Sequence, residues 1–194
     1  MNAHMQYLMA KKHTDRWELE KSKKYFEKVL QLDPEDRLGY SEESRGYLAT
    51  QHLYDTGDDG PILELLRQTS NTESINKGYQ VLIRYYKSRK INENVVNTYE
   101  NALKRLNDDS NLMNGYAWYV YENKLADRYE NAISYARKAL TLRPESAHIW
   151  DTLAWLEFET GERDSAIVHM RIAVNLAPDD EYFQKNLNHF LEVE

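Results

Sequence analysis

Apolar and polar residues recur along the C-terminal half of the chain with the spacing of amphipathic α-helices, and the pattern repeats. Pro144 and Pro178 occupy equivalent places in it, and the apolar residues before one have counterparts before the other. The matched residues are Ala132, Ile133, Ala139 and Leu142 with Ala166, Ile167, Ala173 and Leu176, and Tyr116 and Tyr121 with Trp150 and Trp155. The four prolines all fall where a helical pattern begins or ends. The sequence therefore predicts a nearly all-helical protein built from repeated helix pairs.

Residues 147–178 contain one repeat with aromatic, small and apolar residues in a fixed order. They are Trp150, Leu153, Ala154, Ala166, Met170, Ala173 and Pro178, with Glu157 where an aromatic residue is expected. This order, with the interval from Pro144 to Pro178 as its period of about 34 residues, resembles the tetratricopeptide repeat. The resemblance implies an all-α, right-handed α-solenoid of about five helix pairs in a single domain, residues 1–194. The pairs are expected at 5–34, 36–69, 70–108, 110–144 and 146–178, with a capping helix over 179–194.

The second predicted pair departs most from the pattern. A Gly-Tyr dipeptide is expected to open successive first helices, at Gly39-Tyr40, Gly78-Tyr79 and Gly115-Tyr116. With this alignment the first helix of the second pair is long, from about Asp36 to Tyr54. The second helix is short, from Ile62 to Gln68, after a turn that contains two glycines and a proline.

Polar residues mark where several of the predicted helices begin. Ser70 with Glu73 predicts a capping box for the third pair, and Ser110 and Ser146 predict N-caps for the fourth and fifth. The last predicted helix has a single apolar face, formed by Phe183, Leu187, Phe190 and Leu191. A helix with one apolar face suits the end of a repeat array, because it covers the last repeat and exposes polar residues to water.

The charge of the chain narrows the classes of partner. The formal net charge is −7, and the sequence has no cysteine. Residues 111–194 hold 8 Lys and Arg against 14 Asp and Glu, whereas residues 1–110 hold 17 against 18. An acidic chain without a basic face argues against nucleic-acid binding. No apolar run approaches the roughly 18 residues of a membrane span, so we expect no membrane insertion.

A search for catalytic or metal-binding motifs yields none. The six histidines show no metal-ligand spacing, and Gly57 and Gly60 lack the lysine of a phosphate-binding loop. Paired carboxylates such as Asp58-Asp59 fall in predicted turns, where they are typical turn formers. The sequence therefore predicts a non-catalytic protein without a cofactor.

The resemblance also implies a concave groove lined by the first helices. In such repeats the residue five positions after the signature aromatic points into the groove, and here that row is Lys11, Arg45, Arg84, Tyr121 and Trp155. Nearby positions add Lys87, Lys124 and Phe158 one turn further on, and Asp151 beside the signature position. Cations at one end and aromatic rings at the other predict binding of a protein or peptide segment with acidic and apolar residues.

Two alternatives stay open at this point. The segment around Tyr116-Ala117-Trp118 and 151–155 is similar to the repeat region of certain bacterial thioredoxin-like proteins, which implies an accessory segment whose redox domain lies outside this chain. Self-association through the N-terminal end is the other alternative. The segment 1–5 is as consistent with a cloning remnant as with a native start. The compartment is left open, with the cytoplasm slightly favoured and the periplasm open if the chain is part of a longer protein.

Overall fold

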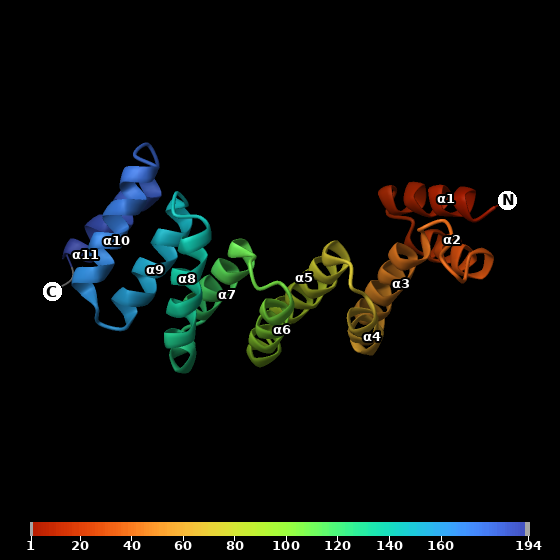
Figure 1. The fold of residues 1–194 in the computed structure, drawn as a ribbon, viewed down its shortest axis with the longest axis horizontal. Helices are drawn as coiled ribbons and strands as arrows, with labels where there is room; N and C mark the ends of the chain where they lie inside the picture. Colours follow the sequence, from red (N-terminus) through yellow and green to blue (C-terminus); the bar gives the residue numbers. More distant parts are fainter. Residues whose placement is uncertain (1, 193–194) are drawn as a thin grey trace. The chain divides into compact units, whose positions relative to one another are not determined.

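The structure is a computed structural model that describes residues 2–192. Within these residues the chain forms eleven α-helices and one short 3-10 helix, and no strand (Figure 1). The prediction of an all-α fold is confirmed. The helices fall into two compact units, Met1–Lys90 and Ile91–Glu194, each described here by itself. The single domain predicted from the sequence stays a prediction.

Five helices belong to the first unit and six, with the 3-10 helix, to the second. In unit 1 they are α1 (Ala3–Asp15), α2 (Leu19–Leu32), α3 (Ser41–Thr56), α4 (Gly60–Gln68) and α5 (Thr72–Ser88). In unit 2 they are α6 (Asn92–Arg105), α7 (Ser110–Glu122), η1 (Ala126–Arg128), α8 (Tyr129–Leu142), α9 (Ala147–Glu159), α10 (Arg163–Leu176) and α11 (Glu181–Glu192). Helices adjacent in sequence pack together as α1 with α2, α7 with α8, and α9 with α10.

Tight turns join the two helices of a pair. Three residues separate α1 from α2 and α9 from α10, and the middle one has a left-handed backbone: Trp17 with φ 59° and Gly161 with φ 85°. Where the paired helices approach, the residues are small and fully buried: Ala10 with Ser22 in the first pair, and Ala154 with Ala166 in the last. The repeated small residues predicted close helix packing, and the structure confirms it.

The period set by the two prolines holds between the last two second helices, α8 and α10, and not between the first helices α7 and α9. Tyr129 and Arg163, which begin α8 and α10, are separated by the same interval as Pro144 and Pro178. The interval between Ser110 and Ala147, which begin α7 and α9, is longer by three positions. The three added residues form η1 in the turn before α8. The predicted pairing of Tyr121 with Trp155 is therefore wrong, because in the helical register Trp118 corresponds to Trp155 and Tyr121 to Phe158.

The start of the second predicted pair also needs correction. Helix α3 begins at Ser41 and not near Asp36, whose carboxylate instead accepts the Ser41 backbone N–H at 2.7 Å. Gly39-Tyr40 thus precedes the helix, and Gly46-Tyr47 occupies the place inside α3 that Gly78-Tyr79 has inside α5. The misalignment arose because Gly39 is a turn residue, with φ 75°.

Two of the predicted helix caps shift by one residue. Asn71 and not Ser70 caps α5, by accepting the Ser74 backbone N–H, and Asp109 and not Ser110 caps α7. Ser146 is the N-cap of α9 as predicted, although its side chain makes no capping hydrogen bond. Asn, Asp and Ser are all favourable N-cap residues, because the side-chain oxygen of each can accept a backbone N–H of the first turn. The sequence alone therefore does not decide whether the serine or its Asn or Asp neighbour caps the helix.

The terminal helix covers the last repeat as predicted. Phe183 and Phe190 of α11 are buried in a cluster with Ala154, Ala166, Met170 and Ala173. Leu187 is partly buried against this cluster. Leu191, in contrast, is 47% exposed, so its predicted place on the buried face is wrong.

Candidate functional site

The predicted groove residues lie in both units. Lys11, Arg45, Arg84 and Lys87 belong to unit 1, and Tyr121, Lys124, Asp151, Trp155 and Phe158 to unit 2. The structure brings some members of each set together, and we describe the two sets separately.

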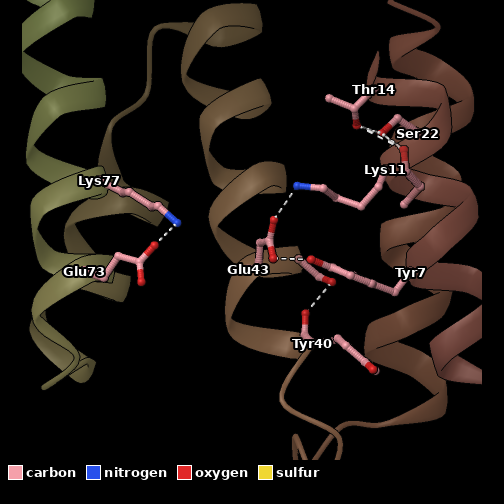
Figure 2. Close-up of polar contacts among 10 residues, drawn as sticks. Tyr7, Lys11, Thr14, Ser22, Tyr40, Glu43, Glu73 and Lys77 are labelled. Carbon is pink, nitrogen blue, oxygen red and sulfur yellow. Dashed lines mark hydrogen bonds and ion pairs between the residues drawn. The ribbon is translucent and has the colours of Figure 1, made fainter. Parts of the chain in front are cut away.

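In unit 1, Lys11 belongs to a polar cluster between α1 and α3 (Figure 2). Its ammonium donates to the Glu43 carboxylate at 2.8 Å, and the hydroxyl of Tyr7, one turn earlier on α1, donates to the same carboxylate. Burial opposes ionisation of Glu43, but the hydrogen bonds from Lys11 and Tyr7 outweigh it, so the pKa of Glu43 is lowered. Burial, with this hydrogen bond, raises the pKa of Tyr7 to about 12.

The other predicted cations of unit 1 have different surroundings. Arg45 is half-buried, and its guanidinium donates to the Pro34 carbonyl at 3.3 Å, on the side of the α2–α3 connection. Arg84 on α5 is exposed, and its Nε donates to the Gln80 carbonyl within the same helix. One more cation on α5, Lys77, pairs with Glu73 at 2.5 Å (Figure 2). Lys11 and Lys77 thus bind carboxylates of unit 1, and Arg45 and Arg84 bind backbone carbonyls of the same unit.

In unit 2 the aromatic residues form one continuous surface. In each of three helices, residues spaced i, i+4 and i+7 lie on one helix face. These sets are Asn114, Trp118 and Tyr121 in α7, Asp151, Trp155 and Phe158 in α9, and Tyr182, Asn186 and His189 in α11. We call this surface the aromatic face and define it as Trp118 and Tyr121 of α7, Trp155 and Phe158 of α9, and Tyr182 and His189 of α11. The rings of Tyr121 and Trp155 stack with centroids 5.2 Å apart, Trp118 lies 5.2 Å from Tyr121, and His189 lies 5.6 Å from Trp155.

Two of the six side chains are well exposed and the others are half-buried. Tyr182 is 44% exposed, and His189 is also exposed. Phe158 is anchored from below by the buried Phe190, with ring centroids 4.4 Å apart. The face is thus held rigidly by the core of unit 2 and remains open to solvent along part of each ring.

Asp151 lies beneath the aromatic face and does not reach its surface. The residue is 3% exposed, and its carboxylate accepts the Asn186 amide at 2.9 Å and the Tyr182 hydroxyl at 3.4 Å. Burial raises the pKa of Asp151 to about 6, although these two hydrogen bonds, His148 and the Trp155 indole oppose the rise. Both hydrogen-bond donors are neutral, and no ammonium or guanidinium group within residues 2–192 forms an ion pair with Asp151.

A further carboxylate, that of Glu159, acts on tyrosines at and near the aromatic face. Burial, then Glu159 and Asp151, raise the pKa of Tyr121, and burial with Glu159 raises that of Tyr129. Glu122, next to Tyr121 on α7, is exposed, as is Glu159. Within residues 2–192 neither glutamate forms an ion pair. Lys124 is exposed in the turn after α7, with a left-handed backbone at φ 52°.

Glu157, which replaces the expected aromatic of the repeat, is fully buried and paired. Its carboxylate accepts Arg137 of α8 at 3.0 Å, and His169 of α10 lies 2.5 Å from its second oxygen. A guanidinium from one neighbouring helix and an imidazole from another satisfy the oxygens of this buried carboxylate. This residue links three helices of unit 2 and does not face the aromatic face.

Sequence reasoning missed Trp118, Tyr182, Asn186 and His189. A signal for Trp118 was available, because Asn114, Trp118 and Tyr121 have the same i, i+4, i+7 spacing as Asp151, Trp155 and Phe158. The alignment on a fixed period hid that signal. The α11 residues carry no repeat signature, since their role depends on where the helix packs.

Two negative findings concern the described part of the chain. Residues 2–192 contain no group of three or more His, Cys, Asp or Glu side chains arranged to hold a metal ion. The helices in the same range are too short or too polar for any of them to cross a membrane.

A family model for the tetratricopeptide repeat matches residues 18–36 and 116–146. No curated protein matches the chain. Among solved structures, the chain is similar to a tetratricopeptide-repeat protein from Parabacteroides merdae, with a TM-score of 0.69 and 14% identity, over 97% of this chain and 72% of that one. It is also similar to YrrB, described as a TPR protein with an unusual peptide-binding site, with a TM-score of 0.63 and 13% identity, over 91% and 87%.

A third similar structure is MamA, with a TM-score of 0.59 and 13% identity over 90% of this chain and 91% of that one. At these identities the solved structures establish a shared fold and nothing finer. Together with the family model, the shared fold supports a tetratricopeptide-repeat protein. Such helical repeats typically serve as protein–protein interaction modules.

Proposed function

We propose that the chain is a non-catalytic interaction module that binds a protein or peptide segment, and that apolar side chains of this segment rest on the aromatic face of unit 2. The observation that carries the proposal is the series of neighbouring rings Trp118, Tyr121, Trp155 and His189 across three helices, with centroids 5.2–5.6 Å apart. Large aromatic side chains that are rigidly held and partly exposed are typical anchors of protein interfaces, where they bury much area at little entropic cost.

For unit 1 we retain the sequence-based proposal that cations attract acidic residues of the partner. Arg84 is the best candidate, because its guanidinium is exposed and its described contact is to a backbone carbonyl. Lys11 is less suited, since Glu43 already binds its ammonium. YrrB is described as having a peptide-binding site, which agrees with this class of function. The accessory thioredoxin-like role and self-association stay predictions.

Site-specific photocrosslinking tests the location of binding. A photoreactive amino acid would replace Tyr182 on the aromatic face or, as a control, Val168 on α10, which is 52% exposed. We expect a partner to be captured from position 182 and not from 168. The captured partner would then be purified and titrated against variants.

In that titration, Trp155→Ala should weaken binding by about 2 kcal/mol or more at every ionic strength, because a central aromatic anchor is lost. Arg84→Ala should weaken binding mainly at low salt, since exposed charges are screened over about 8 Å at 0.15 M. Val168→Ala should bind like the wild type. If folded Trp155→Ala protein also binds like the wild type, the aromatic face is not the binding site.

A further inference from the structure

We propose that the aromatic face of unit 2 binds an arginine side chain carried by a basic segment of a partner protein. This inference rests on the proposed function and specifies the chemistry of the segment that binds there. It differs from the acidic partner predicted from the sequence, because the structure places carboxylates close to these rings.

The net charge of unit 2 favours a basic partner. Residues 91–194 carry 10 Lys and Arg against 18 Asp and Glu, a formal net charge of −8, whereas residues 1–90 carry 15 against 14, a net charge of +1. The net negative charge of the chain therefore belongs to the unit that has the aromatic face. A field of this sign attracts basic segments and repels acidic ones.

Negatively charged side chains also lie close to the aromatic face. Asp151 is buried beneath the rings with only the neutral Asn186 and Tyr182 as hydrogen-bond donors. The exposed Glu159, after burial, raises the pKa of both Tyr121 and Tyr129. A charge buried in a medium of low dielectric is poorly screened by salt, so its field reaches the surface above it.

The rings of the aromatic face also suit a cation. A cation binds to an aromatic ring when it lies over the ring face, within about 6 Å of the centroid. Tyr121 and Trp155 stack on each other, whereas Tyr182, which is 44% exposed and donates its hydroxyl to Asp151 at 3.4 Å, offers such a ring next to the buried carboxylate. A guanidinium suits such a site better than an ammonium does, because it is planar, stacks on rings and is more weakly hydrated.

The contrast with unit 1 indicates that this property belongs to unit 2. The Glu43 carboxylate is also close to an aromatic residue, Tyr7, but Lys11 of the same unit already binds it. Unit 1 thus supplies its own cation to its carboxylate. In unit 2 neither Asp151 nor Glu159 has an ammonium or guanidinium partner within the described residues. An arginine from a partner would pair with the exposed Glu159 and would lie in the field of the buried Asp151.

The test uses the full chain and three fluorescein-labelled decapeptides with glycine and leucine at fixed positions. The variable positions hold arginine in the first peptide, citrulline in the second and glutamate in the third. Citrulline keeps the shape of arginine and removes the charge. Binding is measured by fluorescence anisotropy at low salt and again above about 0.15 M, where screening is strong.

We expect the arginine peptide to bind about tenfold more tightly than the citrulline peptide, and the glutamate peptide to bind most weakly. Glu159→Gln should weaken binding of the arginine peptide at least threefold. The matched variant Glu43→Gln in unit 1 should leave it unchanged, because it removes a carboxylate far from the aromatic face in sequence and in the other unit. Amide chemical shifts should move in α7, α9 and α11.

The outcomes separate this inference from the proposed function. If the citrulline and arginine peptides bind equally, and shifts still map to the aromatic face, the face binds apolar segments and the arginine inference is wrong. Tighter binding of the glutamate peptide would overturn it as well. If the arginine peptide shifts resonances in unit 1 only, the aromatic face is not a binding surface and both proposals fail for unit 2.

Discussion

Each unit has a carboxylate between two helices: Glu43 between α1 and α3 in unit 1, and Asp151 between α9 and α11 in unit 2. The surroundings of the two carboxylates are opposite in kind. In unit 1, α3 provides Glu43, which is about half exposed, with a side-chain exposure of 46%, and binds Lys11 and Tyr7 of α1. In unit 2, α9 provides Asp151, which is buried and accepts only neutral donors from α11. The pKa of Glu43 is lowered, and that of Asp151 is raised to about 6.

The difference shows how one repeat architecture produces two kinds of surface. An exposed ion pair is largely solvated, contributes little to stability and leaves no net charge for a partner. A buried carboxylate without a cation costs stability when it is ionised, and such costs are often retained at functional sites. On this comparison the interaction surface of the protein is expected in unit 2.

The largest expected effect tests whether the units are energetically separate. Phe26 in unit 1 and Phe183 in unit 2 are each 1% exposed, and we expect Phe26→Ala and Phe183→Ala to destabilise their own units by about 3–5 kcal/mol each. Native-state hydrogen exchange should then lose protection first within residues 1–90 and first within 91–194, respectively. Equal loosening of both units by either variant would mean that the chain unfolds as one cooperative body.

The next effect tests the buried carboxylate. The pKa of Asp151 is raised from 3.8 in the unfolded chain to about 6 in the fold. A raised carboxyl pKa contributes stability that is present below pH 3.8 and is lost as pH rises through 6. The stability of Asp151→Asn relative to wild type should therefore grow by about 2 kcal/mol between pH 4 and pH 7.

Urea unfolding followed by tryptophan fluorescence would measure this difference. Three of the four tryptophans, Trp118, Trp150 and Trp155, lie in unit 2, and Trp17 of unit 1 is 85% exposed, so the signal reports mainly on unit 2. Asp179→Asn, which changes an exposed turn carboxylate, serves as the control. A difference for Asp151→Asn that stays constant with pH would show that Asp151 is ionised at no cost in the fold.

The smallest effects compare the two ways in which the units bring paired helices together. In unit 2, Ala166 is fully buried at the helix contact, and Ala166→Leu should destabilise by about 1–3 kcal/mol through overpacking. In unit 1 the corresponding residue, Ser22, donates to the Ala10 carbonyl at 3.0 Å and contacts Thr14 (Figure 2). Ser22→Ala should cost about 0.5–1.5 kcal/mol. Thermal unfolding would measure both, and an unchanged Ala166→Leu variant would contradict the helix pairing.

Much of the fold could be predicted from the sequence, because the small and apolar residues of the last two second helices, α8 and α10, recur at the same interval as Pro144 and Pro178. Alanines at 132, 139, 166 and 173 leave room for only one kind of close helix packing, and all four are buried. The errors came where the period changes. Three added residues before α8 and a turn glycine before α3 displaced the alignment of first helices, and a fixed period cannot reveal such an insertion.

The repeat pattern also allowed part of the aromatic face to be predicted. Tyr121, Trp155 and Phe158 were identified because repeats place equivalent residues on one helix face, which is a local property of sequence. The contribution of α11, whose Tyr182 and Asn186 bind Asp151, depends on how a helix without a repeat signature packs. Whether a carboxylate is paired and exposed, as for Glu43, or buried beside neutral donors, as for Asp151, is decided only by tertiary structure, because desolvation and ion pairing depend on residues that are distant in the chain.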